Sequence, residues 1–362
     1  MGRIMTVRGE IDPSQLGFTH IHEHILADLS FYVKENQAFY PEVPEELLKF
    51  RTENMAFLRS GFHAVSEDCM RLDDAELMTK ELEDFREAGG SSIVEVSPSG
   101  IRGDIRALKE MSEKSGVHIV ACTGLYGEGS WPADCVTASR EELEAFFERE
   151  IQEGIDGSGI RPGMVKIACN TMSETEQQAL RAGAAAARRS GLPLQVHTGV
   201  LLPIDATHAM MEIALAEGLP PERLIMCHMD AYVFRVEFIK DYLLNFEEVS
   251  KLTLEPIKAI LDRGVNVAFD NFGAPGNFEA LGFFGVSDYD RIRGLLALIR
   301  QGYSGQIVLG TDCYTKFSPA RYGGNGYTRI LNFVVPLLAE LGVSEEAIAD
   351  MTVNNPARLL AY

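Results

Sequence analysis

Short apolar runs alternate with longer amphipathic segments along almost the whole chain. Eight of these runs have the length and composition of buried strands: residues 16–22, 91–97, 117–124, 163–169, 193–199, 223–229, 265–273 and 306–312. The segments between them have helical periodicity, and several end in glycine, which commonly terminates a helix. Eight alternating strand and helix units in 362 residues predict an α/β fold, the (β/α)8 or TIM barrel. An open doubly wound sheet is the alternative, but no GxGxxG follows the first strand.

We expect residues 1–362 to form one barrel domain, because barrels of this kind regularly exceed the usual domain size. The segment from about residue 28 to residue 68 departs from a minimal barrel. It is rich in aromatic and acidic residues and separates the first strand from its helix. Such a length is uncommon for an idle connection, so we expect a helical excursion over the barrel mouth or a subunit contact.

The composition narrows the classes of partner and compartment. A formal net charge of −20 argues against binding to nucleic acids and to anionic membrane surfaces. No apolar run is long enough to cross a bilayer, and the first residues lack the apolar core of a signal peptide. The six cysteines form no CxxC motif and lie mostly in or beside apolar runs. This pattern favours reduced thiols and a cytoplasmic location.

Four histidines, a lysine and an aspartate lie where the predicted strands end. The residues are His22 and His24 for the first strand, Lys166 for the fourth, His197 for the fifth, His228 for the sixth and Asp312 for the eighth. Lys166, His197 and His228 follow one another at intervals of 31 residues, which is about one βα unit. In such barrels the catalytic groups gather at the carboxyl ends of the strands. Because imidazole and carboxylate are common zinc ligands, the pattern predicts a metal site.

Several longer motifs carry a family resemblance that covers nearly the whole chain. They are GFTHIHEHI, GMVKIA, QVHTG, CHMD, FDNFG, LGTDCYTK, YGGNGYTRIL and NNPARLL. With these motifs the chain resembles the phosphotriesterase family of the amidohydrolase superfamily, which includes the phosphotriesterase-like lactonases. The resemblance implies two divalent metal ions at the barrel mouth. Zn²⁺ is the expected metal, and Mn²⁺, Co²⁺ and Fe²⁺ are alternatives.

The same resemblance implies a role for each strand-end residue. His22, His24 and Asp312 would bind the more buried metal, and His197 and His228 the more exposed one. Lys166 would bridge both as N6-carboxylysine, with a hydroxide as the second bridge. His20 stands where the family is usually apolar, so we interpret it as a neighbour of the ligands.

Two acidic residues are candidates for catalysis. Asp312 would contact the hydroxide and accept its proton during attack. Asp230 would pass that proton outward, or would orient a ligand histidine.

The substrate contacts are predicted from the loops after three strands. Tyr126 and Asn271 follow the third and seventh strands, where the family places residues near the exposed metal and the substrate; Tyr126 would otherwise serve only packing. Lys316 and Arg321 follow the eighth strand and are candidates for binding an anionic group, with a solvated loop as the alternative.

The leading hypothesis is a dinuclear hydrolase of a lactone or other carboxylic ester, including a phosphorylated sugar lactone, with weak phosphotriesterase activity. The alternative enzyme is an amidase acting on an N-acyl compound. A non-catalytic small-molecule binding protein on a degenerate barrel is a third reading, which is weakened because no ligand position is missing. A small-molecule substrate and a homodimer are the partners that the resemblance implies.

Overall fold

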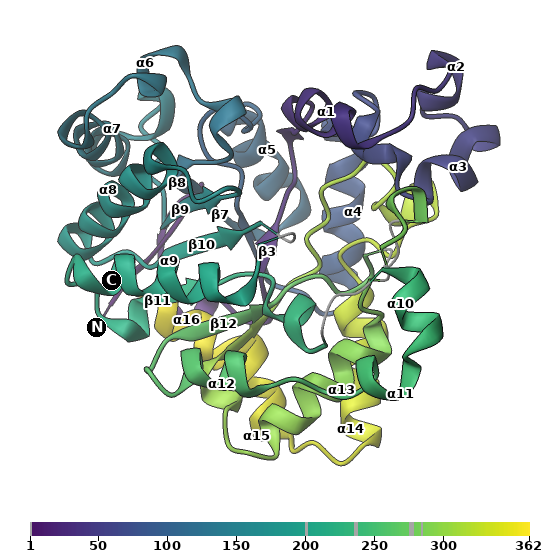
Figure 1. The fold of residues 1–362 in the computed structure, drawn as a ribbon. Coiled ribbons are helices and arrows are strands. Elements are labelled where there is room, and N and C mark those ends of the chain that lie inside the picture. Colours follow the sequence, from purple (N-terminus) through teal and green to yellow (C-terminus); the bar gives the residue numbers. More distant parts are fainter. Residues whose placement is uncertain (1, 200–201, 235–237, 275–278, 284) are drawn as a thin grey trace.

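All eight predicted strands are present in the computed structural model, which describes residues 2–199, 202–234, 238–274, 279–283 and 285–362. They are β3 (Thr19–Glu23), β6 (Ser92–Glu95), β7 (His118–Val120) continuing as β8 (Cys122–Leu125), β9 (Met164–Cys169), β10 (Leu194–Thr198), β11 (Leu224–Met226), β12 (Asn266–Phe269) and β13 (Ile307–Leu309). Only Ala121 separates β7 from β8, so the two together occupy the third barrel position. The predicted TIM barrel is confirmed (Figure 1).

Each barrel strand pairs in parallel with its neighbour along the chain. The hydrogen-bonded orders are β3-β6-β7 and β8-β9-β10-β11-β12-β13. The register places Lys166 of β9 beside Gln195 of β10. Parallel strands in sequential order bring all their carboxyl ends to one rim, which is where the predicted ligands lie.

The seam between the last strand and the first is built differently. Within the described residues, no backbone ladder joins β13 to β3. The backbone N–H of Asp312 instead donates to the His22 carbonyl at 3.2 Å. The carboxylate of Glu23 accepts further bonds from the chain that follows β13. The barrel is therefore closed at this rim largely by a side chain.

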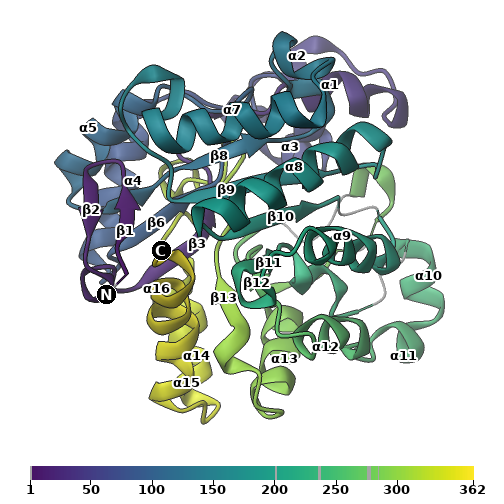
Figure 2. The same cartoon turned by 90° about the vertical axis from the view of Figure 1, so that its left-hand side faces the viewer.

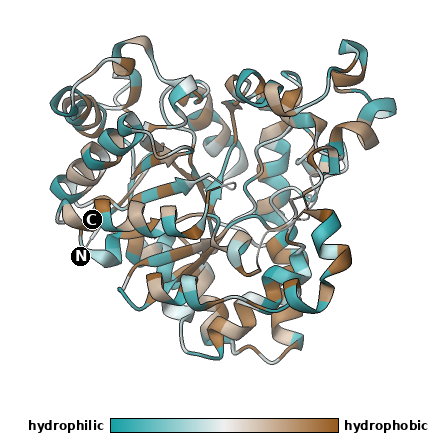
Figure 3. Cartoon of the chain, viewed as in Figure 1, coloured by the Kyte–Doolittle hydropathy of each residue, from teal (hydrophilic) through white to brown (hydrophobic). Residues whose placement is uncertain are grey.

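Amphipathic helices cover the outside of the barrel (Figures 2 and 3). Those that follow the strands are α4 (Ala75–Glu87), α5 (Ile105–Ser115), α7 (Arg140–Glu153), α8 (Glu174–Ser190), α9 (Ile204–Ala216), α12 (Glu255–Leu261) and α13 (Asp288–Ile299). The chain ends with α14 (Val335–Glu340), α15 (Glu345–Ala349) and α16 (Asn355–Leu360). Serine caps begin α7, α8 and α13, and left-handed glycines end α5 and α8. Within the described part of the chain, no helix combines the length and the hydropathy that a bilayer crossing requires.

Small residues let α8 lie close to β9. The buried face of α8 is made almost entirely of alanine and glycine. A Cβ atom on Gly183 would lie 2.6 Å from Cγ1 of Ile167, the residue after Lys166. This close approach fixes the strand that carries Lys166 against its helix.

An N-terminal hairpin, which the sequence patterns did not indicate, covers part of the barrel's amino-terminal end. Its strands are β1 (Ile4–Thr6) and β2 (Gly9–Ile11). The N–H of Val7 donates to Ile119 of β7, and Arg3 and Tyr362 exchange backbone hydrogen bonds. Both ends of the chain therefore lie together (Figure 2).

The segment after the first barrel strand is helical, and it packs at the rim that carries the ligands. It contains α1 (Phe31–Asn36), α2 (Glu45–Leu48) and α3 (Met55–Arg59), between the paired strands β4 (Ala27–Asp28) and β5 (Arg71–Leu72). Three further short helices lie in other connections: α6 (Ala133–Val136), α10 (Ile239–Leu244) and α11 (Phe246–Val249). The rings of Phe31 and Tyr32 lie 6.2 and 6.1 Å from that of Tyr126, at the end of the third barrel strand.

His63 anchors this segment to the loop after β13. Its ring is buried and lies edge-on to Phe317 at 5.2 Å. Nδ1 lies 3.3 Å from the Leu58 carbonyl, and Nε2 lies 3.4 Å from the Tyr314 hydroxyl. Burial lowers the pKa of His63 to about 4.

We expect this histidine to make the fold sensitive to acid. In the unfolded chain His63 binds a proton below about pH 6.5, whereas in the folded chain it does so only near pH 4. The unfolded state therefore binds more protons within this window, and the free energy of unfolding falls as the pH drops through it. Urea unfolding between pH 7 and pH 4 should show a steeper loss of stability for the wild type than for His63→Gln. Equal slopes would contradict the assignment.

Candidate metal centre

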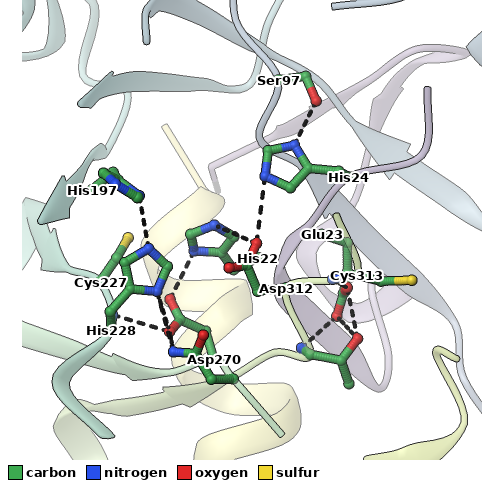
Figure 4. Close-up of polar contacts among 12 residues, drawn as sticks. His22, Glu23, His24, Ser97, His197, Cys227, His228, Asp270, Asp312 and Cys313 are labelled. Atoms are coloured by element: carbon green, nitrogen blue, oxygen red, sulfur yellow. Dashed lines mark hydrogen bonds and ion pairs between the residues drawn. The ribbon is translucent and has the colours of Figure 1, made fainter. Parts of the chain in front are cut away.

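One group of donor atoms combines the first and last barrel strands. His22 lies on β3, His24 directly follows it, and Asp312 follows β13. The Nε2 atoms of His22 and His24 lie 3.5 and 3.4 Å from the same Asp312 oxygen, Oδ1 (Figure 4). Burial opposes ionisation of Asp312, but the imidazoles of His22 and His24 hold its pKa at about 2. The structure thus brings the first predicted ligand set together around an ionised carboxylate.

A second pair of donors lies beside the first group. His197 ends β10 and His228 follows β11. Nε2 of His228 and Nδ1 of His197 are hydrogen-bonded at 2.8 Å, so these two ring nitrogens point toward each other. The rings of His22 and His228 lie 4.9 Å apart, which makes the two sets adjacent. The Tyr126 hydroxyl lies 3.2 Å from His197 Nδ1.

Lys166 lies buried between these sets. Its Nζ is 3.4 Å from Gln195 Oε1 and 3.3 Å from Cys227 Sγ. Within the described residues no carboxylate forms an ion pair with it, and a buried unpaired ammonium is costly. A carbamate at this nitrogen would remove the positive charge.

The charge of Lys166 also acts on histidines of both sets. Burial and then the Lys166 ammonium lower the pKa of His22 to about 4. Burial, the neighbouring His228 and then Lys166 lower the pKa of His197 well below its ordinary value. Both imidazoles are therefore neutral near pH 7, which is the form that binds a metal.

Asp270, at the end of β12, joins the two sets and was missed in the sequence. Its Oδ1 accepts from the backbone N–H and from Nδ1 of His228, at 3.0 and 2.9 Å. Its Oδ2 lies 2.7 Å from Nδ1 of His22. Burial opposes its charge, yet His228 and His22 hold the pKa of Asp270 below its usual range. In turn Asp270 outweighs burial and raises the pKa of His228. The signal was the acidic residue in FDNFG, because ligand histidines usually pair with a carboxylate.

The orientation of His24 is fixed by residues at the carboxyl end of β6. Its Nδ1 lies 2.7 Å from the hydroxyl of Ser97, which donates to Glu95 of β6. Burial raises the pKa of Glu95.

Two observations indicate that the donor set fits metal ions. Nε2 of His22 is buried and, among the described residues, has no hydrogen-bond partner, because its 3.5 Å contact with Asp312 is too poor for one. Asp312 and His228 also have left-handed backbones, with φ of 45° and 61°. Such strained residues gather at functional sites.

Asp230 contacts the neighbours of the ligands. Its Oδ2 accepts from Arg291 Nε at 2.8 Å and from the Asn271 N–H at 3.0 Å, and its Oδ1 accepts from Asn271 Nδ2 at 2.9 Å. Asn271 Nδ2 in turn lies 3.3 Å from His228 Nδ1. Burial raises the pKa of Asp230, and Arg291 opposes this. These contacts favour a positioning role over proton transfer.

The structure does not bring Lys316 and Arg321 together with the histidines. Lys316 Nζ lies 3.2 and 3.4 Å from carboxylate oxygens of Asp68 and Asp73. Arg321 pairs with Glu81 and Asp84. Their predicted substrate role therefore stays a prediction.

A small cleft borders Asp312. It is lined by Phe272, Gly273, Ala274, Thr311, Asp312, Cys313, Tyr314, Thr315, Phe317, Ser318, Asn325 and Gly326. Its walls are the loops after β12 and β13, and their side chains are a mixture of apolar, hydroxyl and amide groups.

Full-length relatives of the chain include proteins named for the hydrolysis of an N-acetyl compound. The N-acetyltaurine hydrolase of Xenopus tropicalis is 29% identical to the chain over 367 residues, covering 100% of this chain and 98% of that protein. The protein of the same name from Homo sapiens is 27% identical over 365 residues, with the same coverage.

Among solved structures, a resiniferatoxin-binding protein from Rhodobacter sphaeroides matches with a TM-score of 0.81 and 29% identity, over 99% of this chain and 95% of that one. A lactonase from Listeria monocytogenes matches with a TM-score of 0.75 and 23% identity, over 99% and 98%, which shows the shared fold. A sequence model of the phosphotriesterase family matches residues 2–360. The chain therefore belongs to the phosphotriesterase family.

Proposed function

We propose that this protein is a dinuclear metal-dependent hydrolase that cleaves the amide bond of an N-acyl compound. The observation that carries the proposal is the convergence of two sets of donor atoms around the buried Lys166. The choice of an amide is supported by full-length relatives named for hydrolysing an N-acetyl compound. The expected lactonase activity has support from the fold alone, at 23% identity.

The residues divide into two ligand sets with one bridge. His22, His24 and Asp312 would hold one divalent cation, and His197 and His228 the other. Lys166 would bridge them after its amine nitrogen forms a bond to the carbon of CO₂ and loses a proton. Two bound divalent cations lower the pKa of a shared water and polarise a carbonyl oxygen. We propose Zn²⁺ as the metal at both sites, because the donors are imidazole nitrogens and carboxylate oxygens.

The remaining chemistry belongs to side chains. Asp312 would accept the proton of the attacking water and return it to the leaving nitrogen, which an ester would not require. Asp270 would keep His22 and His228 in orientation. Tyr126, whose hydroxyl already lies beside His197, and Asn271 would contact the acyl part of the substrate.

Metal analysis and a substrate screen together test the proposal. After reconstitution with Zn²⁺ or Mn²⁺ and bicarbonate, we expect about two metals per chain. The loaded protein should then hydrolyse N-acyl amino acids or N-acyl aminosulfonates faster than lactones or phosphotriesters. Higher kcat/KM on lactones would restore the ester hypothesis. Full activity with one metal would contradict the bridged centre, and a small-molecule binder would show neither metal nor turnover.

We expect Lys166→Ala to lose activity and to lose metal, because it removes the bridging group. Lys166→Glu should retain more metal than Lys166→Ala, since a carboxylate also offers two oxygens. Acetate or propionate should partly restore turnover of Lys166→Ala by occupying the vacated space. Metal content by elemental analysis and kcat with and without the acid check this. Normal binding of two metals by Lys166→Ala would show that the bridge is assigned to the wrong residue.

We expect Asp312→Asn to separate metal binding from proton transfer. The amide keeps one ligand oxygen but cannot accept a proton, so kcat should fall by roughly 10² or more while much of the metal is retained. Steady-state kinetics on samples of known metal content measure this. Near-normal turnover in fully loaded Asp312→Asn would assign the proton to another group.

A further inference from the structure

Glu23 stands between two predicted ligands, but its carboxylate contacts a different part of the chain. His22 and His24 reach the donor cluster, whereas Glu23 lies beside Cys313 (Figure 4). Its Oε1 accepts from the Thr311 N–H at 2.7 Å and from the Thr311 hydroxyl at 2.8 Å. Its Oε2 accepts from that hydroxyl at 2.7 Å and from the Cys313 N–H at 3.1 Å. The side chain is fully buried.

These donors flank Asp312 on both sides. The Asp312 N–H is itself held by the His22 carbonyl at 3.2 Å. Three consecutive N–H groups of the turn are therefore bound to β3. The turn places Asp312 at φ 45°, a left-handed conformation that a residue with a Cβ atom avoids unless its surroundings enforce it.

His20 completes the arrangement. Its Nδ1 lies 2.7 Å from Glu23 Oε1, and its ring packs edge-on against Phe85 with centroids 4.8 Å apart. His20, the first histidine of THIHEH, thus supports the glutamate. In the described structure it contacts neither donor set.

We propose that Glu23 is the positioning residue for Asp312. Its carboxylate holds the left-handed turn so that Asp312 Oδ1 faces both His22 and His24. The inference rests on the proposed metal centre for its functional consequence, while the turn geometry can be tested without metal. Replacing Glu23 by glutamine puts an N–H donor where the carboxylate accepts, so one backbone N–H of the turn is left facing another donor.

Glu176 of α8 provides a matched control in another βα unit. It is also buried, and it accepts from the N–H groups of Asn170, Thr171 and Met172 at 3.0, 2.8 and 2.8 Å. It binds the Thr171 hydroxyl at 3.0 Å, and Met172 is left-handed with φ 59°. Glu176→Gln therefore breaks the same kind of clamp in a loop that carries no predicted ligand.

The test compares Glu23→Gln with Glu176→Gln by competition with a chelator for Zn²⁺. We expect both variants to lower Tm, but only Glu23→Gln to weaken one of the two metals by at least about tenfold, the scale on which groups that support ligands act. A Glu23→Gln protein with wild-type affinity for both metals would overturn the proposal. An equal loss in Glu176→Gln would do the same, because general destabilisation would explain it.

Two further measurements keep the test decisive. If Glu23→Gln does not fold, Thr311→Val removes only the hydroxyl contacts, and it should weaken the same metal with a small change in Tm; unchanged affinity would overturn the proposal. If the wild type binds no metal, the proposed function fails. A crystal structure of metal-free Glu23→Gln then decides the inference alone. We expect Asp312 to leave the left-handed conformation and its contacts with His22 and His24, and an unchanged turn would refute it.

Discussion

One buried carboxylate, Asp270, sets the distance between the two halves of the candidate centre. Its two oxygens reach an imidazole from each half, His228 and His22, at 2.9 and 2.7 Å. The interior of this barrel otherwise concentrates nitrogen ligands and the Lys166 ammonium, which would repel one another if charged. Asp270 adds a negative charge to that of Asp312, and it follows β12, the strand between those that precede His228 and Asp312. The positions of His22 and His228 are therefore coupled through the residue that follows β12.

The rim around this centre is built from chain segments that are distant in sequence. Phe31 and Tyr32 of α1 pack toward Tyr126, whose hydroxyl reaches His197. The loop after β13 is held by two buried side chains. Glu23 binds its Thr311 N–H, and the ring of His63 packs against its Phe317. The excursion of the first βα unit and the loop after the last strand thus both pack at the rim that carries the candidate ligands.

The strands and the ligand types could be predicted because both depend on local signals. Apolar runs define buried strands, and a regular βα period carries residues such as His197 and His228 to equivalent ends. Asp270 could not be assigned in the same way, since its role depends on which imidazole lies across the barrel. In the sequence, Lys316 and Arg321 have no obvious acidic partners, so they were predicted to bind an anionic group. Their carboxylate partners could not be recognised, because they lie more than 200 residues away along the chain. The N-terminal hairpin was missed because its strands are only three residues long.

The close contact between α8 and β9 has an implication for how such a chain can diverge. Most buried residues of α8 are alanine or glycine, and a Cβ atom on Gly183 would lie 2.6 Å from the Ile167 side chain. A bulkier residue there would push on the strand that carries Lys166. Substitutions in this part of the fourth unit are therefore constrained by packing. The loops at the carboxyl ends of the strands are not packed in this way. They can change in length and composition, so new substrates can be acquired there while the centre stays intact.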